Sequence, residues 1–310
     1  MPFSWPTFEQ ALYRIARLRR VIFTSVILAG LVLLLVGVLD PTTLPLQRAV
    51  NILLIVSAVI VAHVVLFPNV PLEALSLSVS ISGFMAVVPL LSVFASFAPM
   101  PYRDAALLLL ICLGMLLVIV VMLVAQFLIE AIVYVGPAVH LRLKTHLDVP
   151  FATFVASRQF GLRPDTRRGR VMTGSADDKG FFDVAVVSQH DLDPDDPTQP
   201  MVVKLDAKVL RSDAANHEVM LVLADGAVTV TSYKFVAKEG GCQVEITEIP
   251  GDFTLGMHAV FWLMDQQTDN LVEVAELLQG GPSCANGLSH AVSLLSIASM
   301  VLSPRQPLLD

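Results

Sequence analysis

Residues 139–150, VHLRLKTHLDVP, alternate apolar and polar side chains and follow directly on a long apolar stretch. On an extended chain Val139 and Leu141 fall on one face, and His140 and Arg142 fall on the other. This alternation predicts a β-strand with one face covered and the other in water. An apolar stretch that ends where such a strand begins predicts a membrane helix joined to a water-exposed sheet domain.

The composition indicates a membrane protein with two unlike parts. Of the 310 residues 55% are apolar and only 15% are charged, which is unusual for a soluble protein of this size. Residues 1–137 hold 6 Lys/Arg and 5 Asp/Glu, whereas residues 138–310 hold 14 and 22. The chain is therefore expected to divide near Gly136 and Pro137.

Four apolar stretches in the first part predict a four-helix transmembrane bundle over residues 21–137. Each reaches or nearly reaches the ~20 helical residues that cross the hydrocarbon of a bilayer. The fourth is longer than a bilayer needs, and we expect it to tilt or to project from the membrane. The stretches are Val21–Leu39, Val50–Phe67, Leu72–Ala98 and Ala105–Val135.

Residues 1–20 are expected to form an amphipathic helix at the membrane surface. Thr7 and Gln10 have the spacing of a capping box, and apolar residues share a face opposite the arginines. The arginines before the first stretch, together with Arg142 and Lys144 after the fourth, place both termini in the cytoplasm by the positive-inside rule. We expect an integral protein of the bacterial inner membrane.

The second part, residues 138–310, is predicted to be a cytoplasmic α+β domain with an antiparallel sheet. Short glycine-containing connections at 224–226, 239–241 and 250–252 separate the later strands. Helices are expected at 151–160, 269–279 and 285–302 from their apolar spacing. The strands after the first are expected at 181–188, 201–210, 216–224, 227–237, 241–249 and 256–264.

This order of elements, together with the residues HLDVPFATF (146–154), resembles the START-like SRPBCC superfamily, the helix-grip fold. The resemblance covers 138–279 and implies a curved sheet that wraps a C-terminal helix around an apolar cavity for greasy ligands. Two departures stand out: GLRPDTRRGRVMTGSADDKG (161–180) replaces the second helix of that fold, and a further helix is predicted after 279.

Two groups of residues are candidates for contact with a ligand or with lipid. The apolar faces of two strands and an aromatic pair are cavity candidates, although the aromatic pair also suits a core. These are Val203, Leu205, Val209, Val244, Ile246, Phe261 and Trp262. A basic strip beside the last span is expected to attract anionic headgroups, or alternatively to set topology. Its members are Arg142, Lys144, Arg167, Arg168 and Arg170.

Several kinds of chemistry are disfavoured by the sequence. The three cysteines are scattered and lack metal-site spacing. The acidic run 191–200 lacks the glycine and glutamate of a calcium loop, and GPSCANG (281–287) lacks a nucleophile elbow. RPDTR (163–167) resembles the arginine pair of cyclic-dinucleotide-binding PilZ domains, but its partner motif is missing. We expect no metal, no cofactor and no catalytic residue, and the acidic balance argues against nucleic acid.

His63 is the ionisable residue deepest within a predicted span, where it is expected to make an interhelical hydrogen bond. Transport would need more such groups at membrane depth. We therefore expect non-enzymatic binding of a hydrophobic ligand or lipid by the membrane-anchored domain. The alternative is an accessory or assembly subunit of a larger membrane complex, in which the sheet domain is a docking module.

Overall fold

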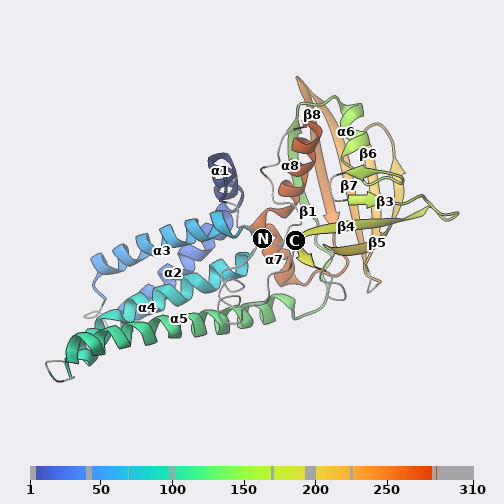
Figure 1. Cartoon of the computed structure of the whole chain (residues 1–310). Helices are drawn as coiled ribbons and strands as arrows, with labels where there is room; N and C mark the ends of the chain where they lie inside the picture. The colour runs from blue at the N-terminus through green and yellow to red at the C-terminus, as the bar shows by residue number, and fades with distance from the viewer. Residues whose placement is uncertain are drawn as a thin grey trace. The chain divides into compact units, whose positions relative to one another are not determined.

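The computed structural model describes residues 5–39, 44–68, 70–97, 99, 102–168, 171–192, 200–223, 226–280 and 284. The chain forms two compact units, Met1–Tyr134 and Val135–Asp310. The first is helical, and the second is built on an antiparallel sheet (Figure 1). Each unit is described by itself.

The helical unit contains a short helix and four long ones. These are α1 (Phe8–Arg17), α2 (Arg19–Leu39), α3 (Leu46–Leu66), α4 (Pro71–Ser96) and α5 (Arg103–Tyr134). Three of them, α2, α3 and α5, are long and apolar enough to cross a membrane. Helix α4 is 26 residues long and contains the shorter apolar segment Pro71–Ala86. Three of the four predicted spans therefore have the length and composition of a membrane helix.

Helix α1 begins with the predicted capping box. The Gln10 backbone N–H donates to Thr7 Oγ1 at 3.2 Å, and the Thr7 N–H donates to Gln10 Oε1 at 3.0 Å. Arg14 and Arg17 do not extend into solvent. Arg14 Nη1 donates to the carbonyl of Val65 at 2.5 Å, and Arg17 Nη2 donates to that of Pro68 at 3.3 Å. The two cations thus meet carbonyls at the C-terminal end of α3, where the helix dipole favours positive charge.

Helix α4 buries a row of serines, which the sequence places at every second position. Each of them donates its hydroxyl to a carbonyl three or four residues earlier in the same helix, so that none needs a partner on another helix. The row consists of Ser76, Ser78, Ser80 and Ser82. Small side chains satisfied in this way let neighbouring helices approach closely.

The second unit is one eight-stranded sheet with three helices. The strands are β1 (Leu143–Val149), β2 (Arg167–Arg168), β3 (Val171–Thr173), β4 (Phe181–Leu192), β5 (Pro200–Ser212), β6 (Asn216–Val222), β7 (Val228–Lys238) and β8 (Gly241–Ile249). Their order in the sheet is β1-β8-β7-β6-β5-β4-β3-β2, and every neighbouring pair is antiparallel. The first strand therefore pairs with the last. The helices are α6 (Thr153–Gln159), α7 (Leu255–Met264) and α8 (Gln266–Leu278).

The opening strand is confirmed, but it starts four residues later than the alternation predicts. The Val139 N–H donates to the carbonyl of Phe253 at 2.8 Å, and the Leu141 N–H donates to that of Val139 at 3.0 Å. Because these two N–H groups are already bonded elsewhere, they do not pair with β8. The pairing of β1 with β8 begins at Leu143. Before it, α5 ends at Tyr134, and Gly136 adopts φ 127°, a conformation that favours glycine.

The strand predicted over 256–264 is wrong, because this segment is helix α7. Its side chains are apolar without alternation, and such a short run cannot be assigned to strand or helix by periodicity. The caps decide. Thr254 Oγ1 accepts from the Met257 N–H at 3.1 Å, and Asp265 ends the helix in the left-handed conformation. The helix predicted over 285–302 lies outside the described residues.

Two apolar clusters form the interior of the sheet domain. One joins α6 and α8 to the inner faces of β1, β7 and β8, and consists of Val149, Ala156, Phe160, Phe235, Cys242, Val244, Ile246, Leu271 and Ala275. The other lies on β4, β5 and β6 around Phe182, Val184, Ala207 and Val219. Figure 1 shows α8 lying along the sheet beside β1. The space between the two clusters is where a cavity can form.

Candidate ligand cavity

A cavity of about 250 Å³ lies between the inner face of the sheet and α8. Both apolar clusters contribute to its wall. Its apolar lining consists of Phe160, Leu162, Val171, Val184, Val186, Leu205, Leu221, Ile246, Leu271, Val274 and Leu277. The cavity therefore lies between the two clusters.

Polar side chains join this lining. They are Arg168, Thr231, Tyr233, Glu248, Gln267, Asn270 and Glu273. Gln267 Nε2 donates to Glu248 Oε2 at 3.0 Å, which links α8 to β8. Arg168 donates to the main-chain carbonyl of Gln159, which fixes its side chain against the end of α6. The lining therefore combines an apolar wall with hydrogen-bonding groups held by their neighbours.

The sheet register brings the polar residues together. On β8 the alternation Cys242, Val244, Ile246 continues inward to Glu248. Tyr233 lies opposite Ile246 on β7, and Thr231 lies opposite Glu248. The inner face of this strand pair is thus apolar toward its α6 end and polar toward its other end.

Burial shifts the pKa values of three of these groups. It raises the pKa of Tyr233 to about 12, although nearby Arg168 opposes this shift. Burial likewise raises the pKa of Glu248, while the hydrogen bond from Gln267 acts in the opposite direction. Burial lowers the pKa of Arg168, opposed by Tyr233 and Glu273. At neutral pH the Tyr233 hydroxyl keeps its proton, so it can donate a hydrogen bond to an oxygen in the cavity.

The structure places two of the seven cavity candidates, Leu205 and Ile246, in the cavity wall. Val244 is fully buried in the cluster under α8, and Val209 packs against the second cluster. Val203 lies on β5 and is 42% exposed.

The aromatic pair Phe261 and Trp262 lies on α7 and not on a strand. Phe261 packs edge-on against Phe253 at 5.4 Å between ring centroids. Trp262 is 54% exposed. Neither residue lines the cavity under α8.

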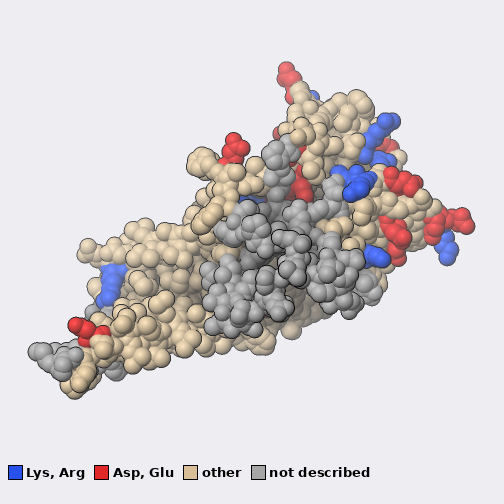
Figure 2. Space-filling model, in the orientation of Figure 1, with Lys and Arg blue, Asp and Glu red and all other residues tan. Residues whose placement is uncertain are grey.

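The headgroup candidates are also separated by the structure. Arg142, Lys144 and Arg167 are exposed, whereas Arg168 is partly buried and lines the cavity. Arg170 lies outside the described residues. In Figure 2 the helical unit is largely free of charged residues, and the blue and red residues gather over the sheet domain.

Six polar cavity residues were not predicted from the sequence, namely Thr231, Tyr233, Glu248, Gln267, Asn270 and Glu273. Two simple signals pointed to three of them. Extending the alternation of β8 by one step places Glu248 inward. Gln267 lies four residues before Leu271, and Asn270 lies four before Val274, so both extend the apolar stripe of α8 at helical spacing. Polarity alone kept these residues out of the predicted core.

Within the helical unit, His63 makes the expected interhelical hydrogen bond. Its Nε2 lies 3.0 Å from Oε2 of Glu73 on α4, and both side chains are buried. The sequence analysis did not consider Glu73, because it stands near the start of a predicted span. Among the described residues no group of three or more His, Cys, Asp or Glu could hold a metal ion.

Comparison with known proteins leaves the family of this chain open. No protein-family model and no curated protein matches it. Among solved structures, protein CV1439 from Chromobacterium violaceum is 12% identical, with 44% of this chain and 97% of that chain covered and a TM-score of 0.33. Protein NE0264 from Nitrosomonas europaea is 12% identical, with 47% and 99% covered and a TM-score of 0.33.

A third similar structure is the di-domain ARO/CYC StfQ from the steffimycin biosynthetic pathway. It is 13% identical, with 55% of this chain and 61% of that chain covered and a TM-score of 0.29. Because each of these TM-scores is below 0.5, nothing about the function of this chain follows from them. The chain consists of a helical unit, in which three apolar helices are long enough to cross a membrane, and an antiparallel sheet domain that follows it.

Proposed function

We propose that the sheet domain binds a small amphiphilic molecule, or part of a lipid, without converting it, and that the helical unit anchors it to the membrane. The observation that supports this proposal most is the mixed lining of the cavity. An apolar wall is combined with a protonated Tyr233 and the Arg168 cation. Pockets that bind small molecules typically have this character, with a few polar groups that fix orientation.

The cavity lining also supports one class of ligand. An apolar body would lie against Leu205, Leu221 and Ile246. An oxygen-bearing end would accept hydrogen bonds from Arg168 and Tyr233, which favours a carboxylate, carbonyl or phenol over an amine. A volume of about 250 Å³ lies just below the ~300 Å³ of the smallest typical ligand pockets, which favours a small molecule or one acyl segment.

The membrane arrangement completes the proposal. Helix α4 serves as the fourth span, both termini lie in the cytoplasm, and the membrane is the bacterial inner membrane. The sheet domain is a START-like helix-grip domain, in which α8 is the gripped helix. The pairing of β1 with β8 and the packing of α8 on the inner face support this assignment. A tether of this kind would keep the cavity near lipids, where a poorly soluble ligand is concentrated.

Photolabelling of the full chain in nanodiscs tests the proposal. The probe is a short fatty acid carrying a diazirine, and labelled peptides are mapped by mass spectrometry. We expect label on cavity peptides, and we expect Leu205→Trp, which fills the cavity, to remove it. Val202→Trp is the matched control, because Val202 is 39% exposed on the same strand and does not line the cavity.

A second pair of probes tests the polar end. Arg168→Gln should reduce labelling by the fatty acid more than labelling by the corresponding alcohol, because only the carboxylate pairs with the guanidinium. Label confined to the helical unit, or unchanged by Leu205→Trp, would overturn the proposal and favour the accessory-subunit alternative.

A further inference from the structure

Helix α7 presents an apolar stripe outside the cavity. Leu255 is 66% exposed and Trp262 is 54% exposed, and Ala259 between them is also exposed. Their spacing of four and then three residues places all three on one face of the helix. The buried His258 lies beside this stripe, so α7 is held to the domain along the edge of the stripe while the stripe itself stays exposed.

The segment that contains α7 is held against the chain that has just left α5. The Val139 N–H donates to the carbonyl of Phe253 at 2.8 Å, and the Val139 carbonyl lies 2.6 Å from Nε2 of His258. His140 Nδ1 lies 3.3 Å from the carbonyl of Pro250. These contacts all lie within the sheet domain and join its start to the first turn of α7 and to the chain just before it.

Covalent geometry then limits how far α7 can lie from the end of α5. The chain passes from Tyr134, the last residue of α5, to Val139 in five residue steps, which span at most about 18 Å. Helix α5 is long and apolar enough to cross a membrane. Val139, to which the α7 segment is hydrogen-bonded, is therefore tethered to the last residue of this helix by at most about 18 Å of chain.

The composition around the stripe matches the interface of a bilayer. Tryptophan is enriched at the level of the headgroups, and leucine inserts into the adjoining acyl region. Apart from His258, α7 carries no ionisable side chain. Arg142, three residues after Val139, is exposed and supplies a cation for an anionic headgroup.

From this we propose that α7 is an interfacial helix that docks the sheet domain on the bilayer crossed by α5. Leu255, Ala259 and Trp262 insert among the lipids, and Arg142 contacts headgroup phosphate. This inference concerns the orientation of the domain and does not depend on ligand binding in the cavity. The occupant of the stripe is lipid, and not a second protein or another segment of this chain.

Quenching of tryptophan fluorescence tests the inference in the full chain. The sequence contains two tryptophans, so Trp5→Phe leaves Trp262 as the single reporter. The protein is placed in nanodiscs of phosphatidylcholine and phosphatidylglycerol, with or without bromine on the acyl chains. We expect brominated lipid to reduce the emission of Trp262 roughly twofold or more, and aqueous iodide to have little effect.

The control moves the reporter to a site of similar exposure in the same domain. Phe154 on α6 is 65% exposed. It follows the far end of β1, about 20 Å along the strand from the residues that bind α7. In the variant Trp5→Phe, Trp262→Phe, Phe154→Trp we expect quenching by iodide and not by brominated lipid.

Two results would overturn the inference. Quenching of Trp262 by iodide alone would show that the stripe faces water. Protection from both quenchers would show that protein covers it, and deletion of 285–310 would then identify whether that segment is the cover. In either case the photolabelling result for the cavity would stand unchanged.

Discussion

Tyr233 is the residue whose burial has the clearest consequence for stability. Its pKa is raised to about 12 in the folded chain, against an ordinary value of 10.0. The stabilising contribution of the neutral hydroxyl is therefore complete below pH 10 and is lost as the pH rises toward 12. We expect the wild type to lose about 2 kcal/mol more than Tyr233→Phe over this interval. Denaturant unfolding at pH 9 and pH 12 would check this, and an equal loss in both proteins would contradict it.

The pKa of Glu248 is also raised in the folded chain, and it affects stability at a lower pH than Tyr233 does. Because burial raises its pKa in the folded chain, the protonated carboxyl stabilises the domain in acid, and this contribution is lost as the pH rises through its folded value. Glu248→Gln keeps a hydrogen-bonding partner for Gln267 without the charge. We expect this variant to be more stable than wild type at pH 7, with a smaller difference at pH 4. Thermal unfolding at both values would show it, and a variant less stable at pH 7 would refute the assignment.

At this scale the sequence was informative about apolar positions and misleading about polar ones. The alternation of apolar and polar residues correctly predicted that Leu205 and Ile246 face the interior of the domain. Arg168 was grouped with the headgroup candidates because it belongs to a basic strip that follows the last predicted span. Its burial follows from contacts with residues far apart in sequence, such as its bond to Gln159 and its position near Tyr233 and Glu273. No local pattern contains those contacts.

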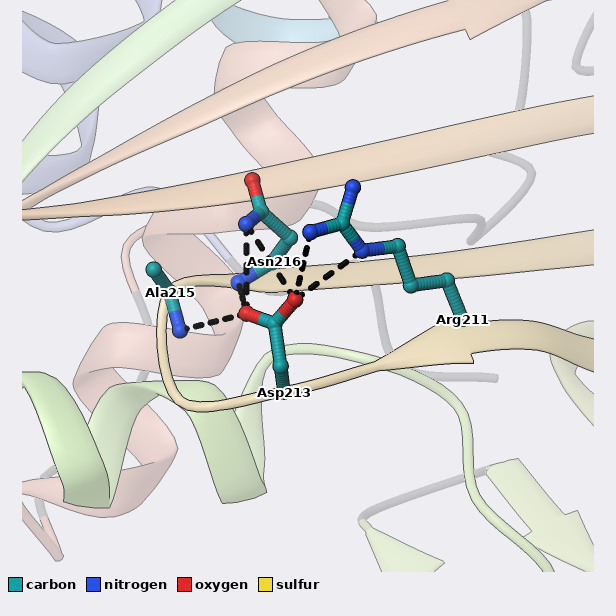
Figure 3. Close-up of polar contacts among 4 residues, drawn as sticks. All are labelled: Arg211, Asp213, Ala215 and Asn216. Carbon is teal, nitrogen blue, oxygen red and sulfur yellow. Dashed lines mark hydrogen bonds and ion pairs between the residues drawn. The ribbon is translucent and has the colours of Figure 1, made fainter.

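In the connection between β5 and β6, the carboxylate of Asp213 holds the turn by several hydrogen bonds (Figure 3). Asp213 accepts from the backbone N–H groups of Ala215 and Asn216 at 2.9 and 2.7 Å, and Arg211 Nε donates to it at 2.9 Å. These bonds, the Ala215 bond first, lower its pKa to about 2. Its contribution to stability is thus present above pH 3.8 and is lost as the pH falls toward 2.

Replacing Asp213 should therefore loosen the turn. We expect Asp213→Ala to be less stable than wild type at pH 7, because two turn N–H groups lose their acceptor, and to differ little from it at pH 2. Hydrogen exchange of the Ala215 and Asn216 amides would report the change. Asp206→Ala, on the exposed side of β5, is the control, and equal effects of the two variants would count against the turn mechanism.

The pair formed by α3 and α4 has an equally specific polar contact. Glu73 and His63 are buried and 3.0 Å apart, so removing the carboxylate leaves an imidazole without this partner. We expect Glu73→Leu to destabilise the helical unit by about 3 kcal/mol. Glu73→Gln, which keeps an acceptor, should cost less. Thermal unfolding in detergent would rank the two variants, and equal stabilities would contradict a role for the hydrogen bond.

Elements with a periodic pattern and recognisable ends were predicted correctly, and elements without them were not. The hairpins from β5 to β8 follow from alternation between glycine-rich turns. Segment 256–264 has uniform apolarity, and only the Thr254 cap and the conformation of Asp265 distinguish helix from strand. A cap residue before an apolar run is visible in sequence, so greater weight on Thr254 would have corrected the assignment.

At the scale of the whole molecule, a change in charge density marks the boundary between the two units. The sequence boundary at Gly136 and Pro137 lies within three residues of the end of the helical unit at Tyr134. The cavity, by contrast, depends on how α8 packs on the inner face of the sheet. That packing is a property of the assembled domain, and the sequence could supply only the resemblance that suggested a cavity.

Native mass spectrometry of the full chain, released from detergent, tests the central claim most directly. The account predicts that an amphiphile with an oxygen-bearing end copurifies with wild type and with Val202→Trp, and is absent from Leu205→Trp. An equal complement of bound molecules in all three proteins, or a larger protein assembly carrying none, would contradict ligand binding in the cavity under α8.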